Sequence, residues 1–170
     1  MTGFKAQIAR HRDAVNVAHA RVRATVRTRD RSDADRGAWM EACREFHALR
    51  SEIEVYVERV SGEGLADPLL RRFVFDYLSV DPVYFRSGYQ KERLLKAVKR
   101  LELTDEEAVV LRQTILRRVR TGALREFRHL CRLMPQVQTD EFVAELRAAA
   151  GGADDEIRRR AAFALTYVAS

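Results

Sequence analysis

Long apolar runs are absent from this sequence: none approaches the roughly 20 residues that a membrane-spanning helix requires. No apolar segment follows the first charged residues, so we expect no signal peptide. Cysteine is also scarce. Cys43 and Cys131 both fall within apolar helical patterns, which indicates buried, reduced thiols and no disulfide framework. These absences together predict a cytoplasmic protein that has no membrane partner.

Catalytic and metal-binding motifs are absent as well. The eight glycines stand singly except for Gly151–Gly152, so the chain has no loop that could cradle a phosphate. Cys43 and His47 are spaced to share one helix face, but no third ligand is apparent, and Glu126-x-x-His129 occurs in one copy only. We therefore expect no enzyme, no cofactor and no metal site, although catalytic groups on distant helices would leave no local motif.

Lysine and asparagine are rare, and arginine dominates the basic residues. Only four of the 31 Lys and Arg residues are lysines. An arginine-rich, alanine-rich and asparagine-poor composition is typical of a GC-rich bacterial genome, so part of the formal net charge of +6 reflects codon usage.

What is present is a charge pattern laid over helical periodicity. Residues 1–31 carry eight Lys and Arg against two Asp, whereas residues 32–66 carry four Arg against eight Asp and Glu. Apolar residues recur at helical spacing from about Thr2 to Arg29 and again from Trp39 to Val60. A basic helix joined to an acidic helix by a short connection predicts an antiparallel hairpin over residues 1–62.

The rest of the chain, residues 65–170, reads as a body of shorter helices. Asp67–Pro68 and Asp81–Pro82 each look like an acidic N-cap followed by proline at the first helical position. Thr104 and Glu107 have the spacing of a capping box. The helices expected here cover residues 69–78, 83–87, 90–101, 104–122, 124–134, 142–150 and 154–168. With no strand pattern anywhere, the fold class is all-α, with either two domains or one continuous domain.

The last helix pair resembles a known repeat. Residues 143–168 carry an acidic turn at Asp154–Asp155, an Ile157–Arg158 step and a small apolar face formed by Ala161, Ala162, Ala164 and Leu165. This pattern is similar to a HEAT-like α-helical repeat. Families that contain the repeat are mostly interaction scaffolds, and the resemblance implies a protein-binding role here.

Arginine is concentrated between residues 112 and 132. This stretch holds one acid, Glu126, and seven arginines, which are Arg112, Arg117, Arg118, Arg120, Arg125, Arg128 and Arg132. Lys96, Lys99 and Arg100 precede it. Guanidinium groups bind phosphate in a bidentate manner, and Tyr84, Phe85 and Tyr89 could stack on bases if they are exposed. The stretch is therefore a candidate nucleic-acid or anion site, and its alternative is an ordinary solvated face.

One histidine has a candidate role of its own. The segment FHALRSEIE (residues 46–54) resembles the phospho-accepting segment of two-component phosphotransfer proteins at His47, Leu49, Arg50 and Ser51. The resemblance implies that His47 would accept the phosphoryl group and that Arg50, one turn later, would steady it.

Three hypotheses follow. In the first, the chain is a non-catalytic interaction or scaffold protein that binds a protein partner. That partner could be a second copy of the chain, bound through the hairpin. The alternative is a nucleic-acid-binding protein that uses Arg112–Arg132. The third is a phosphotransfer module acting through His47.

Overall fold

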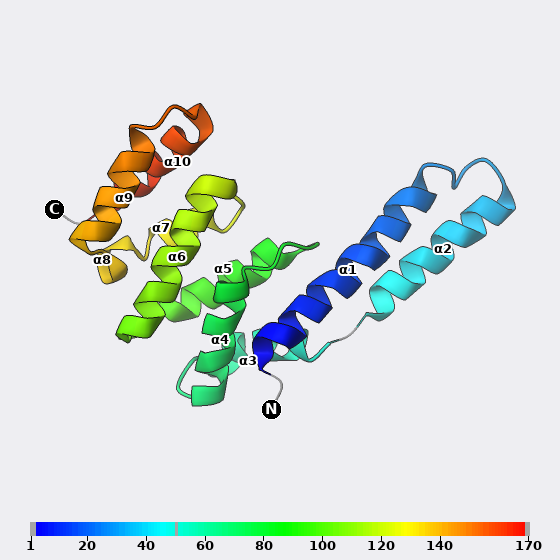
Figure 1. The fold of residues 1–170 in the computed structure, drawn as a ribbon. Helices are drawn as coiled ribbons and strands as arrows, with labels where there is room; N and C mark the ends of the chain where they lie inside the picture. The colour runs from blue at the N-terminus through cyan, green and yellow to red at the C-terminus, as the bar shows by residue number, and fades with distance from the viewer. Residues whose placement is uncertain (1–2, 50, 169–170) are drawn as a thin grey trace.

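The computed structural model describes residues 3–49 and 51–168, and within those ranges every regular element is a helix (Figure 1). The elements are α1 (Phe4–Val26), α2 (Asp33–Ala48), α3 (Glu52–Glu63), α4 (Pro68–Val80), α5 (Ser87–Val98), α6 (Asp105–Thr121), α7 (Phe127–Cys131), α8 (Met134–Val137), α9 (Asp140–Ala150) and α10 (Asp155–Leu165). The predicted all-α class is confirmed. No helix in this part of the chain is both long and apolar enough to cross a membrane.

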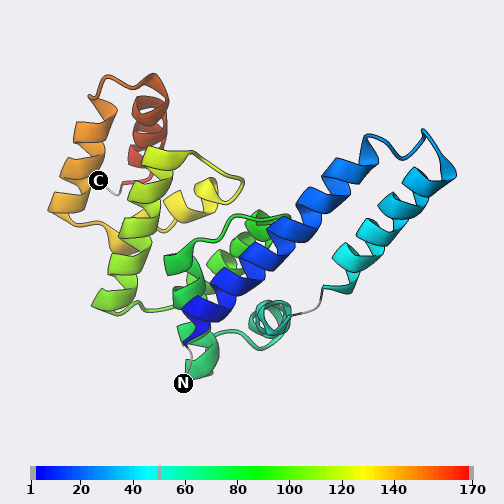
Figure 2. The same ribbon diagram turned by 45° about the vertical axis from the view of Figure 1, so that its right-hand side comes forward.

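Helices α1 and α2 form the expected packed pair and run side by side in opposite directions (Figures 1 and 2). The Ser32 side chain caps α2 by accepting a hydrogen bond from the Asp35 N–H. Arg21 pairs with Glu45, the one ion pair between α1 and α2 in the described ranges. The two helices carry opposite net charges, but an ion pair therefore links them at one point and not along their whole length.

The second helix is shorter than predicted. It was expected to continue to Val60, but α2 ends at Ala48, and Leu49 and Ser51 are extended. Helix α3 then leaves the hairpin and packs against α5, burying Ile53 and Val57. The period of apolar residues continues across the break because both helices bury one face, so periodicity alone could not show the change of direction. Thr2, the expected start of the first helix, lies outside the described residues.

A single hydrophobic cluster draws on both predicted parts of the chain. Ile8 from α1 and Leu111 from α6 belong to it and are fully buried. Helix α4 lies at its centre and packs against α1 and α6. The ring of Phe73 contacts two other rings. Its centroid lies 5.4 Å from the ring centroid of Phe4 and 5.0 Å from that of Tyr56. The base of the hairpin is thus part of the body's core, whereas its outer half extends away from the body (Figure 1).

The turn after α4 differs from the prediction. Asp81 does not cap a helix at 83–87. It is the C-cap of α4 in a left-handed conformation, with φ of 50°. Gly88, which directly follows that predicted helix, lies in the first turn of α5. A Cβ at Gly88 would be 3.2 Å from Oε2 of Glu126, so the glycine provides room for that carboxylate.

The C-terminal helices follow the sequence signals more closely. The capping box of Thr104 and Glu107 is confirmed, and the Thr139 and Asp154 side chains cap α9 and α10. The helix expected over residues 124–134 is divided into α7 and α8, and Pro135 lies in the first turn of α8. Helices α9 and α10 pack together as a pair.

Candidate anion-binding site

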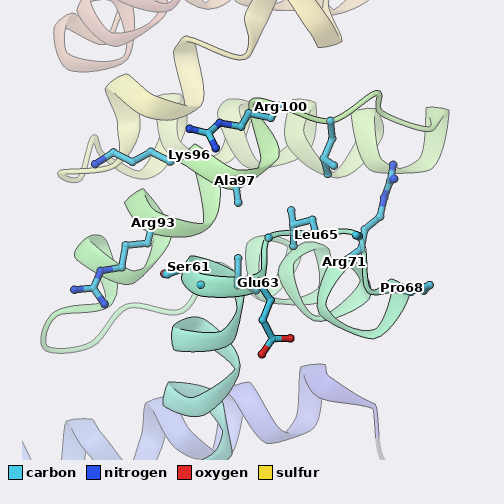
Figure 3. A pocket seen from close by; sticks show the side chains of 14 residues that line it. Ser61, Glu63, Leu65, Pro68, Arg71, Arg93, Lys96, Ala97 and Arg100 are labelled. Carbon is cyan, nitrogen blue, oxygen red and sulfur yellow. The ribbon is translucent and has the colours of Figure 1, made fainter.

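A groove of about 850 Å³ lies between the turn that joins α3 to α4 and one side of α5 (Figure 3). Its apolar lining comes from Val60, Leu65, Ala97 and Leu101. The turn carries Gly64 at φ of 77°, a conformation that residues with a Cβ seldom adopt. The groove has the size of a typical ligand site.

The edge of the groove is cationic. Arg93 and Lys96 are three residues apart and share one exposed face of α5, and both extend outwards from the groove (Figure 3). Arg100 lines the groove from the turn just after the helix. Arg71 lines the groove too, but Glu107 already binds it: Nε and Nη2 each donate to that carboxylate at 2.6 Å. Arg93, Lys96 and Arg100 are exposed, whereas Arg71 is half-buried, so these three are the groove's more accessible positive charges.

Glu92 connects this cationic edge to α7. Its carboxylate lies 3.1 Å from Lys96 Nζ, 3.2 Å from Arg125 Nε and 3.3 Å from His129 Nε2. Hydrogen bonds from Lys96 lower the pKa of Glu92, which keeps it ionised. A single carboxylate therefore holds three basic side chains from α5 and α7 together.

Further positive charge lies near His129 and affects its pKa. Burial lowers it, Glu92 raises it, and the charges of Arg132, Lys96 and Arg128 lower it again. The exposed cations of α5, of the turn after it and of the α7 segment are together called the α5–α7 basic face; they are Arg93, Lys96, Lys99, Arg100, Arg125, Arg128 and Arg132. All seven are exposed. Over residues 89–101 and 124–133 the sequence contains two acids, Glu92 and the buried Glu126.

The predicted arginine cluster is divided between two environments. Arg125, Arg128 and Arg132 join the basic face. Three arginines of α6 are instead bound to the protein: Arg112 donates to the Val137 carbonyl, Arg117 to the Ser79 carbonyl, and Arg118 pairs with Asp81. Arg120 is exposed on the same helix and pairs with Glu145 at the surface. Tyr84 is buried, whereas Phe85 and Tyr89 are 43% and 53% exposed.

Beneath the basic face lies a buried group of four charges. Lys91 Nζ lies 2.6 Å from an Asp81 carboxylate oxygen and 2.9 Å from one of Glu126, and Arg118 pairs with Asp81. The side chains are at most 7% exposed. Glu126 also faces the first turn of α5, where the helix dipole favours negative charge. Two cations balance two anions, and no ligand can reach them, so the group joins α4, α5, α6 and the turn before α7.

His47, the predicted phospho-acceptor, is exposed on α2. It lines a cavity of about 180 Å³ together with Glu54, Arg86 and Gln90. Arg50, which the resemblance pairs with His47, lies outside the described residues. The Glu54 carboxylate would repel an incoming phosphoryl group, and the phosphotransfer hypothesis stays a prediction.

Sequence reasoning missed Arg93, Lys91 and the groove, and its interpretation of Asp81 as an N-cap was wrong. The buried charge at Lys91 could have been detected in the sequence. Lys91 lies on the same face of α5 as the apolar residues Leu94, Leu95 and Val98. The groove had no such signal, since it forms between residues 60–68 and α5, which are distant in the sequence.

Comparison of the chain with protein-family models, with curated proteins and with solved structures gives no match. Its function is therefore argued from the geometry above.

Proposed function

We propose that this chain is a non-catalytic binding protein whose ligand is the phosphate backbone of a nucleic acid, held on the α5–α7 basic face. The observation that carries the proposal is the set of seven exposed Lys and Arg residues on α5, the turn after it and the α7 segment, two of which, Lys96 and Arg125, pair with the same carboxylate, Glu92. Neutralising phosphates with such residues releases counterions and supplies most of the affinity of non-specific binding. The expected compartment is the cytoplasm.

Removing three of these charges tests the proposal. In the variant Arg93→Gln, Lys96→Gln and Arg100→Gln, we expect binding to a labelled 20-nucleotide strand to weaken at least tenfold at low salt. The slope of log affinity against log salt should fall by about one for each phosphate that the variant no longer neutralises. Fluorescence anisotropy at several salt concentrations measures both quantities.

The hairpin provides a matched control. Arg23, Arg27 and Arg31 are also exposed, and changing them to Gln removes the same total charge. The proposal requires this control variant to bind as the wild type does. An equal loss in both variants would show that only the net charge matters, and unchanged binding in the first variant would place the ligand elsewhere.

A second candidate is a protein-binding scaffold that uses the outer half of the hairpin, with a second copy of the chain as the partner. The observation that favours it is apolar exposure on these two helices: Val17 is 72% and Met40 is 55% exposed. Ala42 is the one residue of α2 that is buried. A helix pair with so little covered surface gains stability from an additional partner. The HEAT-like resemblance of residues 143–168 supports the same class of function.

A further inference from the structure

One aromatic residue lies on the same stripe as the cations of α5. Tyr89, Arg93 and Lys96 follow one another at spacings of four and three residues, which places them on one face of α5, and Arg100 lies in the turn just after the helix. Tyr89 is 53% exposed and does not belong to the hydrophobic core. Its position is therefore not explained by packing of the fold.

The environment of Tyr89 differs from that of the neighbouring tyrosines. Tyr77 and Tyr84 are buried, and their hydroxyl groups lie 2.7 Å apart in a shared hydrogen bond. Over the ring of Tyr89 lies the Arg125 guanidinium, with Cζ 4.1 Å from the ring centroid. Arg125 is held there by Glu92, to which its Nε donates at 3.2 Å. The fold thus fixes a flat, cation-bearing stack at the surface, beside the phosphate-binding charges.

Such a stack has little use on a double helix, whose bases already stack on one another and face inwards. A single strand exposes the face of each base, and proteins that bind single strands without sequence preference combine a cationic track with exposed aromatic side chains. The groove that Arg93, Lys96 and Arg100 border has a volume of about 850 Å³, which is enough for a second unstacked base.

We infer that the nucleic acid bound by the α5–α7 basic face is single-stranded, with one base stacked on the Tyr89–Arg125 pair while Arg93, Lys96 and Arg100 bind the adjoining phosphates. This inference rests on the proposed function and deepens it by naming the class of nucleic acid. Stacking on one aromatic side chain is worth about 5- to 150-fold in affinity.

The test compares four probes on the full-length chain by fluorescence anisotropy. They are a 20-nucleotide single strand of DNA, the same strand as RNA, the DNA duplex, and a DNA strand of equal charge in which all bases are removed. We expect the wild type to bind both single strands at least tenfold more tightly than the duplex and the abasic strand. DNA and RNA strands that bind equally would show that the sugar is not read, and a difference would show which strand the site prefers; either result supports the inference.

Two substitutions locate the effect. Tyr89→Leu should lower affinity for the single strands at least fivefold while leaving binding to the abasic strand and the slope of affinity against salt unchanged, because it removes no charge. Tyr89→Phe keeps the ring and should bind as the wild type does. The matched control is Trp39→Leu on α2, which removes another arginine-covered ring, that of Trp39 beneath Arg29, and should leave binding unchanged.

The outcomes separate this inference from the proposed function. Equal binding of all four probes, with a steep salt dependence that the α5 glutamine variant reduces, would overturn the inference and leave the proposed function standing. Binding to none of the probes at low salt would overturn both. A wild-type preference for single strands that survives in Tyr89→Leu would show that another residue stacks the base.

Discussion

At the scale of single residues, the most consequential group is the set of buried charges around Lys91. Removing water from four ionised side chains costs free energy that their mutual attraction and hydrogen bonds must offset. Lys91 lies between two carboxylates, so each of them depends on it. Arg118, a member of the same group, was predicted to bind a ligand. A charge reversal at Arg118 would therefore test the stability of the fold and not ligand binding.

Lys91→Met should lower the free energy of unfolding by about 3 kcal/mol or more, because it leaves Glu126 buried without its ion-pair partner. Urea denaturation followed by circular dichroism measures the change. The matched control on the same helix is Lys96→Met, whose side chain is 63% exposed and pairs with Glu92 at the surface; it should cost less than about 1 kcal/mol. A Lys91→Met variant as stable as the control would contradict the role assigned to the cluster.

His11 makes stability depend on pH. It is buried on α1 with its ring edge-to-face against Tyr84, and Nε2 has no hydrogen-bond partner. Burial lowers the pKa of His11 below its usual 6.5, and the opposing influence of Glu54 is smaller. The unfolded chain therefore takes up the proton at a higher pH than the folded chain does.

It follows that the free energy of unfolding should fall as the pH is lowered through 6.5, with the loss complete below the folded-state pKa. His11→Leu should flatten the dependence between pH 7 and 5, measured by urea denaturation at each pH. Burial also lowers the pKa of His129, so this histidine accounts for the pH dependence that remains in His11→Leu. Arg71 lowers the pKa of the Glu107 carboxylate. Carboxylates of this kind lose their contribution to stability only nearer pH 4. A steeper profile in His11→Leu would refute the assignment.

At the scale of the elements, the hairpin and α5 show how one helix can serve two purposes. The inner stripe of α1 packs on α4 near its start, where Ile8 is fully buried, and against α2 further along. Farther out the same helix pair has no third layer. On α5, the buried face holds Leu94, Leu95 and Lys91, while the opposite face carries the basic stripe and Tyr89.

If the hairpin is a dimerisation element, Val17→Glu or Met40→Glu should convert the dimer to a monomer, because each change places a charge on apolar surface that a partner would cover. Sedimentation velocity over a range of protein concentrations measures the mass. Val109→Glu on α6, where the valine is 39% exposed, is the control that should not change it. A monomeric wild type at every concentration would rule out this partner.

At the scale of the whole molecule, the sequence predicted the class and the order of helices well. The capping box of Thr104 and Glu107 forms as expected, because a capping hydrogen bond depends on residues two or three positions apart. The predictions failed where a distant contact decides the local structure. Asp81 ends a helix because it pairs with Lys91 and Arg118, and the predicted helix to Val60 breaks because α3 turns to pack on α5.

The candidate site divides in the same way. The sequence alone determined that the chain is helical and rich in arginine, since helical periodicity and composition are local properties that need no partner. Which arginines remain available was decided only by the tertiary structure. Arg112, Arg117 and Arg118 contact backbone or acids of other segments, whereas packing of α7 on α5 adds Arg125, Arg128 and Arg132 to the α5 cations. Exposure and pairing depend on which segments meet in space, and that is fixed by burial of the whole core.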